Sequence, residues 1–171
     1  MIEGVNLKII NKLSDIIFSI EKLIAIILAS VLLISLASGV LFRTLKSPLF
    51  WSDELAIFCL IWMTFIGGSM GLKKNASPSI TIVTDLLSQN AKKVVLFVGN
   101  LILLVFIGYL LFLAYQWISM PNIKVQTSTA MNIPKLYFYL CIPVSFVFMV
   151  IHVFNNLFLS FKTIDEAGDL N

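Results

Sequence analysis

Charged side chains are scarce in this 171-residue chain, in which Asp, Glu, Lys and Arg together make up 12% of the residues. A soluble domain of ordinary composition carries about 25% charged residues. Hydrophobic residues make up 59% and the mean hydropathy is +0.99, so too few polar side chains remain to cover a surface in water. The apolar residues also fall into blocks, which indicates that lipid is the solvent. The length allows a single membrane domain over residues 1–171.

Cysteine and histidine are scarcer still, with two cysteines and one histidine. Cys59 and Cys141 each lie inside an apolar block, and His152 is the only histidine. A disulfide framework, a metal site and a Ser-His or Cys-His catalytic group are therefore not expected. No glycine-rich phosphate-binding loop occurs, and the lysines flank apolar blocks, which argues against nucleic acid as a partner. The sequence predicts neither an enzyme nor a bound cofactor.

Four uncharged runs are long enough to cross a membrane, because about 30 Å of hydrocarbon takes roughly 20 helical residues. They predict transmembrane helices at about 23–42, 50–72, 94–117 and 136–161. The first run is longer than a signal-peptide core and no clean cleavage site follows it, so we expect it to be retained. Pro143 should break one backbone hydrogen bond in the fourth run and kink it. The predicted fold class is an all-α integral membrane protein.

The basic residues are distributed unequally between the two sides of the predicted membrane domain. The side that holds both termini and the second loop carries Lys8, Lys12, Lys22, Lys73, Lys74, Lys92, Lys93 and Lys162, whereas the first and third loops carry Arg43, Lys46, Lys124 and Lys135. Basic residues accumulate on the cytoplasmic side of membrane proteins. Both termini are therefore predicted to lie in the cytoplasm.

Two segments outside these runs are amphipathic. Isoleucine and leucine repeat at helical spacing over about 7–20, which predicts a helix on the inner membrane surface. The alternative is that this segment prolongs the first span. Residues 79–89 are too short to span and predict a second interfacial helix, with a plain loop as the alternative. Lys73, Lys74, Lys92 and Lys93 flank that segment in pairs and are expected to contact anionic lipid headgroups.

The predicted spans contain no Asp, Glu, Lys or Arg in their interiors. An ion pathway normally needs such groups, or clustered polar ligands, in mid-membrane. Asn100 in the third span is the best polar candidate, but an interhelical hydrogen bond is the simpler explanation. His152 lies toward the inner end of the fourth span without a predicted carboxylate partner, which favours a packing role over a proton relay.

Small residues mark two faces on which helices could approach each other closely. Gly67 and Gly71 form a GxxxG pair in the second span, and Ser35 and Gly39 form a similar pair in the first. Such pairs allow close packing, either within one chain or against another protein.

A charged corner lies at the outer end of the second span, where Trp51 is followed by Asp53 and Glu54. One explanation is structural: Ser52 caps the helix, and two acids favour its N-terminus. The functional alternative is a charged contact with a partner subunit.

A series of short motifs runs through the chain. Trp51-Ser-Asp-Glu54 is followed by Trp62, Phe65-Ile-Gly-Gly68, Lys73-Lys74, Ile80-Thr-Ile-Val83 with Asp85, Ser128-Thr-Ala-Met-Asn-Ile-Pro134 and Tyr139-Leu-Cys-Ile-Pro143. In their order, spacing and topology these motifs resemble the small membrane subunit of TRAP (tripartite ATP-independent periplasmic) transporters over nearly the whole chain. Many members carry a histidine just before the inner-loop isoleucine, where this chain has Ser79, so a role tied to that histidine is not expected.

The resemblance implies that the chain does not transport alone. A much larger membrane subunit would carry the substrate and sodium sites, and a soluble periplasmic protein would deliver a small organic acid. The small subunit would anchor the large one as a scaffold in the bacterial inner membrane, with sodium coupling expected on the large subunit. General likeness favours sialic acid over a dicarboxylate, without support from any single residue.

The expected contact with the large subunit consists of Trp51, Asp53, Glu54, Gly67 and Gly71. The alternative function is a self-sufficient homo-oligomeric transporter of the multidrug-exporter kind. That function would need a carboxylate within the membrane, and the first predicted span contains none.

Overall fold

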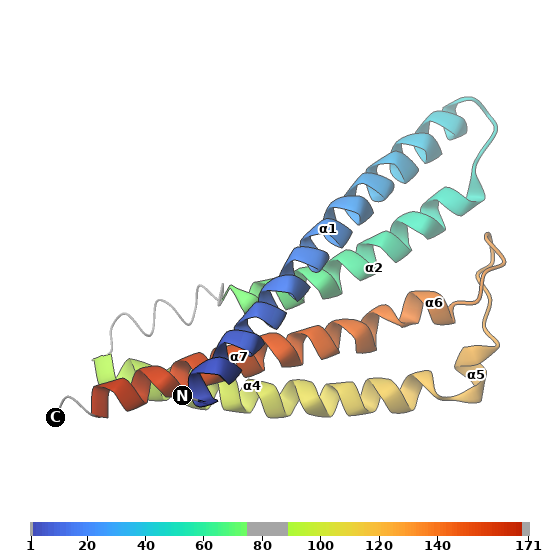
Figure 1. Cartoon of the computed structure of the whole chain (residues 1–171). Helices are drawn as coiled ribbons and strands as arrows, with labels where there is room; N and C mark the ends of the chain where they lie inside the picture. Colours follow the sequence, from blue (N-terminus) through green and yellow to red (C-terminus); the bar gives the residue numbers. More distant parts are fainter. Residues whose placement is uncertain (1, 75–88, 169–171) are drawn as a thin grey trace.

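The computed structural model describes residues 2–74 and 89–168, and helices make up most of this part of the chain (Figure 1). The helices are α1 (Ile2–Thr44), α2 (Phe50–Lys73), α4 (Gln89–Ile118), α5 (Pro121–Lys124), α6 (Leu136–Tyr139) and α7 (Cys141–Gly168). Four segments are long and apolar enough to cross a membrane, namely Ile9–Thr44, Phe50–Lys73, Val94–Ile118 and Leu136–Leu159. The predicted all-α fold with four transmembrane helices is confirmed. The predicted interfacial helix over 79–89 falls almost entirely outside the described residues.

Helix α1 is a single unbroken helix of 43 residues. The separate amphipathic helix predicted over 7–20 is thus replaced by a prolongation of the first span, which was the alternative interpretation. At 1.5 Å per residue the apolar segment Ile9–Thr44 is about 54 Å long, well beyond the 30 Å of a hydrocarbon core. The helix therefore extends beyond the uncharged run 23–42 toward the N-terminus, and this extension carries Asp15 and Glu21.

A short turn joins α1 to α2. The amide of Ser47 donates to the carbonyl of Phe42 at 3.0 Å and that of Lys46 donates to Arg43 at 3.2 Å, while Lys46 has a φ of 59°. This pattern of two bonds around a left-handed residue is a Schellman motif, which satisfies the last carbonyls of a helix. Pro48 follows and prevents the helix from continuing. The chain is thereby turned back so that α2 runs antiparallel to α1.

The four long helices are arranged as two pairs (Figure 1). Helices α1 and α2 lie side by side, as do α4 and α7, and α7 also packs against α2. Near its N-terminal end α1 crosses α7, and it diverges from α7 toward Thr44. Three helices, α1, α2 and α7, therefore meet at only one end of the molecule.

The fourth span is interrupted at Leu140, between α6 and α7. Pro143 lies three residues further on and has no N–H to donate to the carbonyl of Tyr139. The regular pattern resumes when the amide of Val144 donates to the carbonyl of Leu140 at 3.2 Å. The disturbance expected from Pro143 thus takes the form of a break one turn before it.

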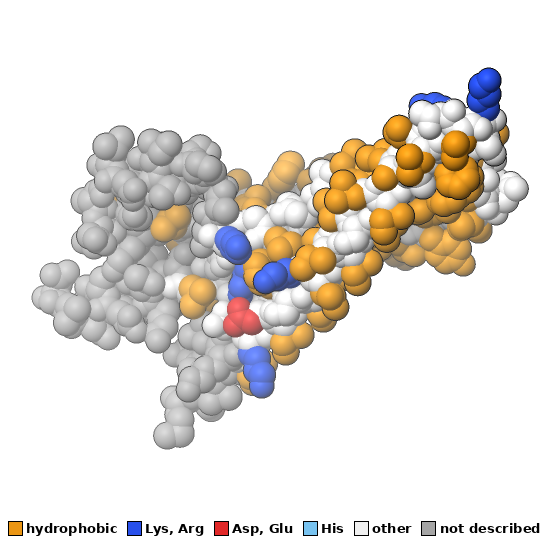
Figure 2. Space-filling view, turned by 90° about the horizontal axis from the view of Figure 1, so that it is seen from above, with side chains coloured by type: hydrophobic (Ala, Val, Ile, Leu, Met, Phe, Trp, Pro, Cys, Tyr) orange, Lys and Arg blue, Asp and Glu red, His pale blue; other side chains and the backbone are white. Residues whose placement is uncertain are grey.

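Most of the apolar surface of the helices is exposed. In the most apolar stretch of each candidate span, at most 28% of the residues are buried within the chain. Figure 2 shows a face on which apolar side chains lie between basic side chains at one end and a mixed group of acidic and basic side chains toward the other. Lipid or other protein must cover this surface, because water would oppose such exposure.

Helices α1 and α2 approach each other closely at the small pair of the first span. The hydroxyl of Ser35 donates to the carbonyl of Ser52 at 2.7 Å, and both residues are buried. A Cβ atom added to Gly39 would lie 2.6 Å from the Oγ atom of Ser52. This small-residue pair is therefore used within the chain.

Replacement of Gly39 by alanine should destabilise the α1–α2 pair, because the added methyl group collides with Ser52. Overpacking of this kind costs about 1–3 kcal/mol, more than the gain from replacing a helical glycine. The matched control is Gly108→Ala in α4, where an added Cβ atom has no neighbour within 4 Å. Thermal unfolding in detergent should show a lower midpoint for Gly39→Ala only; equal midpoints for the two variants would contradict the packing described here.

Candidate functional site

A group of polar side chains lies where α1, α2 and α7 meet. Ser14, Asp15 and Glu21 come from α1, Lys73 comes from α2 and His152 comes from α7; we call these five residues the inner polar cluster. The side chains of Glu21 and His152 have no exposed surface, and Nε2 of His152 lies 3.0 Å from Oε2 of Glu21. A carboxylate and an imidazole that are both withdrawn from solvent are uncommon in a membrane domain and are functional candidates.

The cluster continues from His152 to the surface of the molecule. Nδ1 of His152 lies 2.8 Å from the hydroxyl oxygen of Ser14, to which Nζ of Lys73 donates, also at 2.8 Å. Lys73 in turn pairs with Asp15 at 2.8 Å. The side chain of Lys73 is 13% exposed and that of Asp15 is 61% exposed. An unbroken chain of polar contacts thus leads from solvent or headgroups to the buried Glu21.

Amide side chains extend this polar region along α7. Nδ2 of Asn155 donates to Oδ1 of Asn11 at 3.3 Å, and Nδ2 of Asn156 donates to the carbonyl of Leu72 at 2.8 Å. The three helices are therefore joined at this end by hydrogen bonds as well as by apolar packing.

The inner polar cluster corrects one expectation from the sequence. Glu21 lies two residues before Leu23, outside the predicted span 23–42 but within the longer apolar segment Ile9–Thr44. His152 was expected to lack a carboxylate partner, and Glu21 is that partner. Sequence reasoning missed the pair because Glu21 precedes Lys22 directly before the uncharged run and therefore resembles a flanking charge. The seven-residue spacing of Ser14 and Glu21, which places both on one helical face, was the available signal.

Asn100, the other polar candidate, is half-buried on α4. Its side chain makes no hydrogen bond to another residue in the described part of the chain. The interhelical hydrogen bond expected for Asn100 is thus not formed with any described residue of this chain.

At the opposite end of α2, Glu54 holds the loop between α5 and α6. Its carboxylate accepts hydrogen bonds from the hydroxyl of Ser128 at 2.5 Å and from the amides of Ala130 at 3.0 Å and Thr129 at 3.3 Å. The same loop is closed on itself by an antiparallel bridge between Thr127 and Pro134. Glu54 therefore has a structural role inside this chain, and its role in contact with a partner stays a prediction.

The other residues of the charged corner are more exposed. Asp53 pairs with Arg43 at 2.9 Å on the surface, and Trp51 is 42% exposed. The predicted cap is corrected: α2 begins at Phe50, and Ser52 lies in its first turn with its hydroxyl donating to the carbonyl of Leu49 at 2.8 Å. The cap residue is Leu49, which has no capping side chain.

The GxxxG pair of α2 differs from the small pair of α1. A Cβ atom added to Gly67 or Gly71 would have no neighbour within 4 Å. No other part of the described chain uses this face for close packing. It is open to lipid or to another protein.

Two of the lysines expected at lipid headgroups have partners within the chain. Lys73 is engaged with Ser14 and Asp15, and Nζ of Lys74 lies 5.5 Å from the centre of the ring of Phe18. The side chains of Lys92 and Lys93 fall outside the described residues. Headgroup binding by these four lysines stays a prediction.

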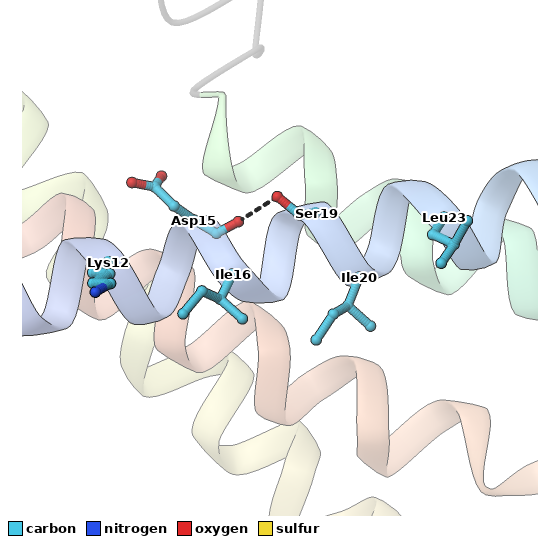
Figure 3. A pocket seen from close by; sticks show the side chains of 6 residues that line it. All are labelled: Lys12, Asp15, Ile16, Ser19, Ile20 and Leu23. Carbon is cyan, nitrogen blue, oxygen red and sulfur yellow. Dashed lines mark hydrogen bonds between the residues drawn. The ribbon is translucent and has the colours of Figure 1, made fainter.

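A shallow hollow of about 450 Å³ lies along the exposed side of α1 (Figure 3). Its lining consists of Lys12, Asp15, Ile16, Ser19, Ile20 and Leu23. The hydroxyl of Ser19 donates to the carbonyl of Asp15 at 2.9 Å, so it is already paired within the helix. All six residues belong to one helix, and they do not form a walled binding site.

Comparison with known proteins identifies similar sequences. The family model for the DctQ component of the tripartite ATP-independent periplasmic transporters matches residues 24–163. The sialic acid TRAP transporter small permease protein SiaQ of Vibrio cholerae is 29% identical over 150 residues, which are 87% of this chain and 86% of SiaQ. A putative TRAP transporter small permease protein of Haemophilus influenzae is 27% identical over 146 residues, or 84% of this chain and 85% of that protein.

A further relative is much longer than this chain. The isethionate TRAP transporter permease protein DctMQ of Oleidesulfovibrio alaskensis is 26% identical over 107 residues. These residues are 63% of this chain but only 17% of that protein. The chain therefore matches less than a fifth of the length of this relative.

Replacement of Glu54 by alanine should loosen the loop around Ser128 without unfolding the helices. Hydrogen bonds to a charged group contribute about 1.5–3 kcal/mol each, so hydrogen exchange of the Thr129 and Ala130 amides should accelerate at least about tenfold. Asp53→Ala is the matched control, since its exposed ion pair contributes little. Equal exchange rates in the Glu54→Ala and Asp53→Ala proteins would show that Glu54 does not hold the loop.

Proposed function

The chain belongs to the DctQ component family of the tripartite ATP-independent periplasmic transporters, and we propose that it anchors a larger transport subunit in the inner membrane. Family membership rests on the match over residues 24–163. With its four apolar spans the chain is a multi-pass membrane protein. Its relatives are transporter permease proteins, a class without enzymatic activity, and the proposed role is that of a scaffold.

The open face of α2 carries this proposal. Gly67 and Gly71 offer a surface on which another helix could approach closely, and no described part of this chain occupies it. In lipid, helix association depends on such close packing, because apolar burial alone gives little advantage over lipid tails. A subunit that has to hold a partner in the membrane needs a surface of this kind.

The length of the isethionate relative favours a large partner subunit. More than four fifths of that permease protein lies outside the segment that resembles this chain. We infer that in the present system the remaining functions belong to a separate, larger membrane subunit. That subunit would carry the substrate and sodium sites, and a periplasmic protein would deliver the substrate to it.

We infer a small organic acid as the substrate and favour sialic acid over a dicarboxylate. The similarity to SiaQ over 87% of this chain supports sialic acid. The proposed orientation places both termini in the cytoplasm, in agreement with the excess of lysine on that side. Trp51 and Asp53 would then face the periplasm and remain candidates for contact with the large subunit.

The family match argues against the alternative function of a self-sufficient exporter. One structural feature nevertheless agrees with that alternative. Glu21 supplies a buried carboxylate that the predicted first span lacked. The carboxylate is enclosed by His152 on α7 rather than by a substrate cavity. We therefore retain the scaffold as the proposed function.

Blocking the open face of α2 should weaken assembly with the large subunit. In the double variant Gly67→Leu/Gly71→Leu, two bulky side chains would keep a partner helix at a distance. Extraction in mild detergent, with a tag on the C-terminus, should recover a much larger membrane protein with the wild type and at least about tenfold less with the variant, which corresponds to about 1.4 kcal/mol.

The matched control for this experiment is Gly99→Leu/Gly108→Leu on α4, where both glycines are equally open. The thermal midpoint of each purified variant shows whether the chain itself remains folded. Undiminished recovery of the large protein with a folded α2 variant would place the contact elsewhere. Recovery of a homo-oligomer without any larger protein would contradict the scaffold function.

Uptake into proteoliposomes should require more than this chain. We expect no accumulation of sialic acid by the chain alone, even with a sodium gradient, because the proposed transport sites lie on the large subunit. Addition of the large subunit and the periplasmic binding protein should restore uptake. Uptake or efflux by this chain alone would overturn the proposed division of functions.

A further inference from the structure

The donors and acceptors of the inner polar cluster fix its hydrogen-bond directions. The ammonium group of Lys73 can only donate, so the hydroxyl oxygen of Ser14 accepts from it. The hydroxyl proton of Ser14 is then free to be donated to Nδ1 of His152, 2.8 Å away. This leaves the other ring nitrogen, Nε2, as the N–H that donates to Glu21 at 3.0 Å. Each of these three hydrogen bonds has one donor and one acceptor when His152 is neutral and Glu21 is ionised.

In this state the Glu21–His152 pair carries one negative charge without any exposure to solvent. The carboxylate also has unused acceptor capacity, because Oε1 of Glu21 is buried and has no hydrogen-bond partner among the described residues. A buried carboxylate with a single donor is costly. One added proton would neutralise the pair and reduce this cost.

We propose that Glu21 and His152 form a proton-binding site within the membrane region, which exchanges protons with the surface through Ser14 and Lys73. A metal ion is a poorer fit, because metal sites need three or more protein ligands, and no group of three His, Cys, Asp or Glu occurs in the described part of the chain. The pair offers one carboxylate and one imidazole, which suffice to hold a proton between them.

The geometry provides a balanced route for the proton. Ser14 gives its hydroxyl proton to Nδ1 of His152 and takes one from Lys73, which is protonated again from water near Asp15. The net change is one proton added to His152, while Ser14 and Lys73 end with the protons that they had at the start. In the loaded state Nδ1–H donates to the Ser14 oxygen, so the direction of that hydrogen bond is reversed.

The other charged groups at this end of the molecule come from two helices. Helix α1 contributes Asp15, and α2 contributes Lys73 together with Lys74, which lies over the Phe18 ring. From residue 141 to 159, α7 carries no Asp, Glu, Lys, Arg or His besides His152 itself, and α4 carries none from 94 to 118. Among these charged side chains, Lys73 is connected to the pair by hydrogen bonds, through the hydroxyl of Ser14.

The depth of the pair indicates a functional site rather than a surface interaction. Glu21 lies seven residues further along α1 than Ser14, or about 10 Å deeper into the span. Apolar residues could fill such a position at equal or lower cost. The inference does not depend on the scaffold function, because it concerns protonation of this chain alone.

The single histidine makes the site directly observable. The full chain, labelled with ¹⁵N-histidine and placed in lipid nanodiscs, should give the two ring-nitrogen signals of a single imidazole. Near pH 8 we expect a bare Nδ1 and a protonated Nε2, and on acidification to about pH 5 we expect uptake of one proton. Glu21→Gln should move this uptake to lower pH by about one unit or more, because it removes the charge that favours the imidazolium.

Lys73→Gln is a second variant at a partly exposed position, and it should move proton uptake to higher pH because a neighbouring cation is removed. Asp53→Asn at the far end of α2 is the control and should leave the titration unchanged. The proposal is overturned by an imidazole that does not titrate between about pH 8 and pH 5, or by a protonated Nδ1 at pH 8. It is also overturned by a folded Glu21→Gln or Lys73→Gln protein that titrates like the wild type; if Glu21→Gln does not fold, the Lys73→Gln protein decides.

Discussion

The contact between Glu21 and His152 connects residues 131 positions apart in the chain. Neither side chain reaches solvent, and lipid offers no hydrogen bonds, so each polar group at this depth must find its partner in the protein. This constraint explains several features together. Helix α1 has to continue without a break to bring Ser14 and Glu21 onto one face, and α7 has to present His152 to both of them. The meeting of three helices at this end follows from these requirements.

The two ends of the molecule are held in different ways. At one end, buried polar groups join α1, α2 and α7; at the other, Glu54 fixes the loop that contains Ser128. Between these ends the helices are mostly apolar and expose much of their surface. The polar contacts that join the helices are therefore concentrated at the two ends of the molecule. The surface between them is apolar and exposed, so it is available for contact with lipid or with another protein. This arrangement is compatible with the proposed role of a subunit that holds another protein.

The proposed proton site would allow the charge at one end of this helical structure to change. Protonation of His152 would reverse the hydrogen bond to Ser14 and place a second cation beside Lys73, close to the end of α2. Burial makes such a change in charge energetically important, because the low dielectric constant weakens screening. The site lies where the two helix pairs meet, because α1 and α2 belong to one pair and α7 belongs to the other.

The sequence by itself determined the four spans, the absence of strands in the described part of the chain, and the family. These depend on runs of apolar residues and ordered motifs, which are local signals. The sequence did not determine the length of α1, because the charged residues Glu21 and Lys22 resemble the flanking charges at the end of a transmembrane span. Tertiary structure decided that Glu21 is buried, since only the approach of α7 supplies His152. It also decided that Gly39 packs within the chain while Gly67 and Gly71 remain open. All three glycines belong to pairs of small residues with the same four-residue spacing. Their roles differ because close packing depends on which helix lies opposite each pair.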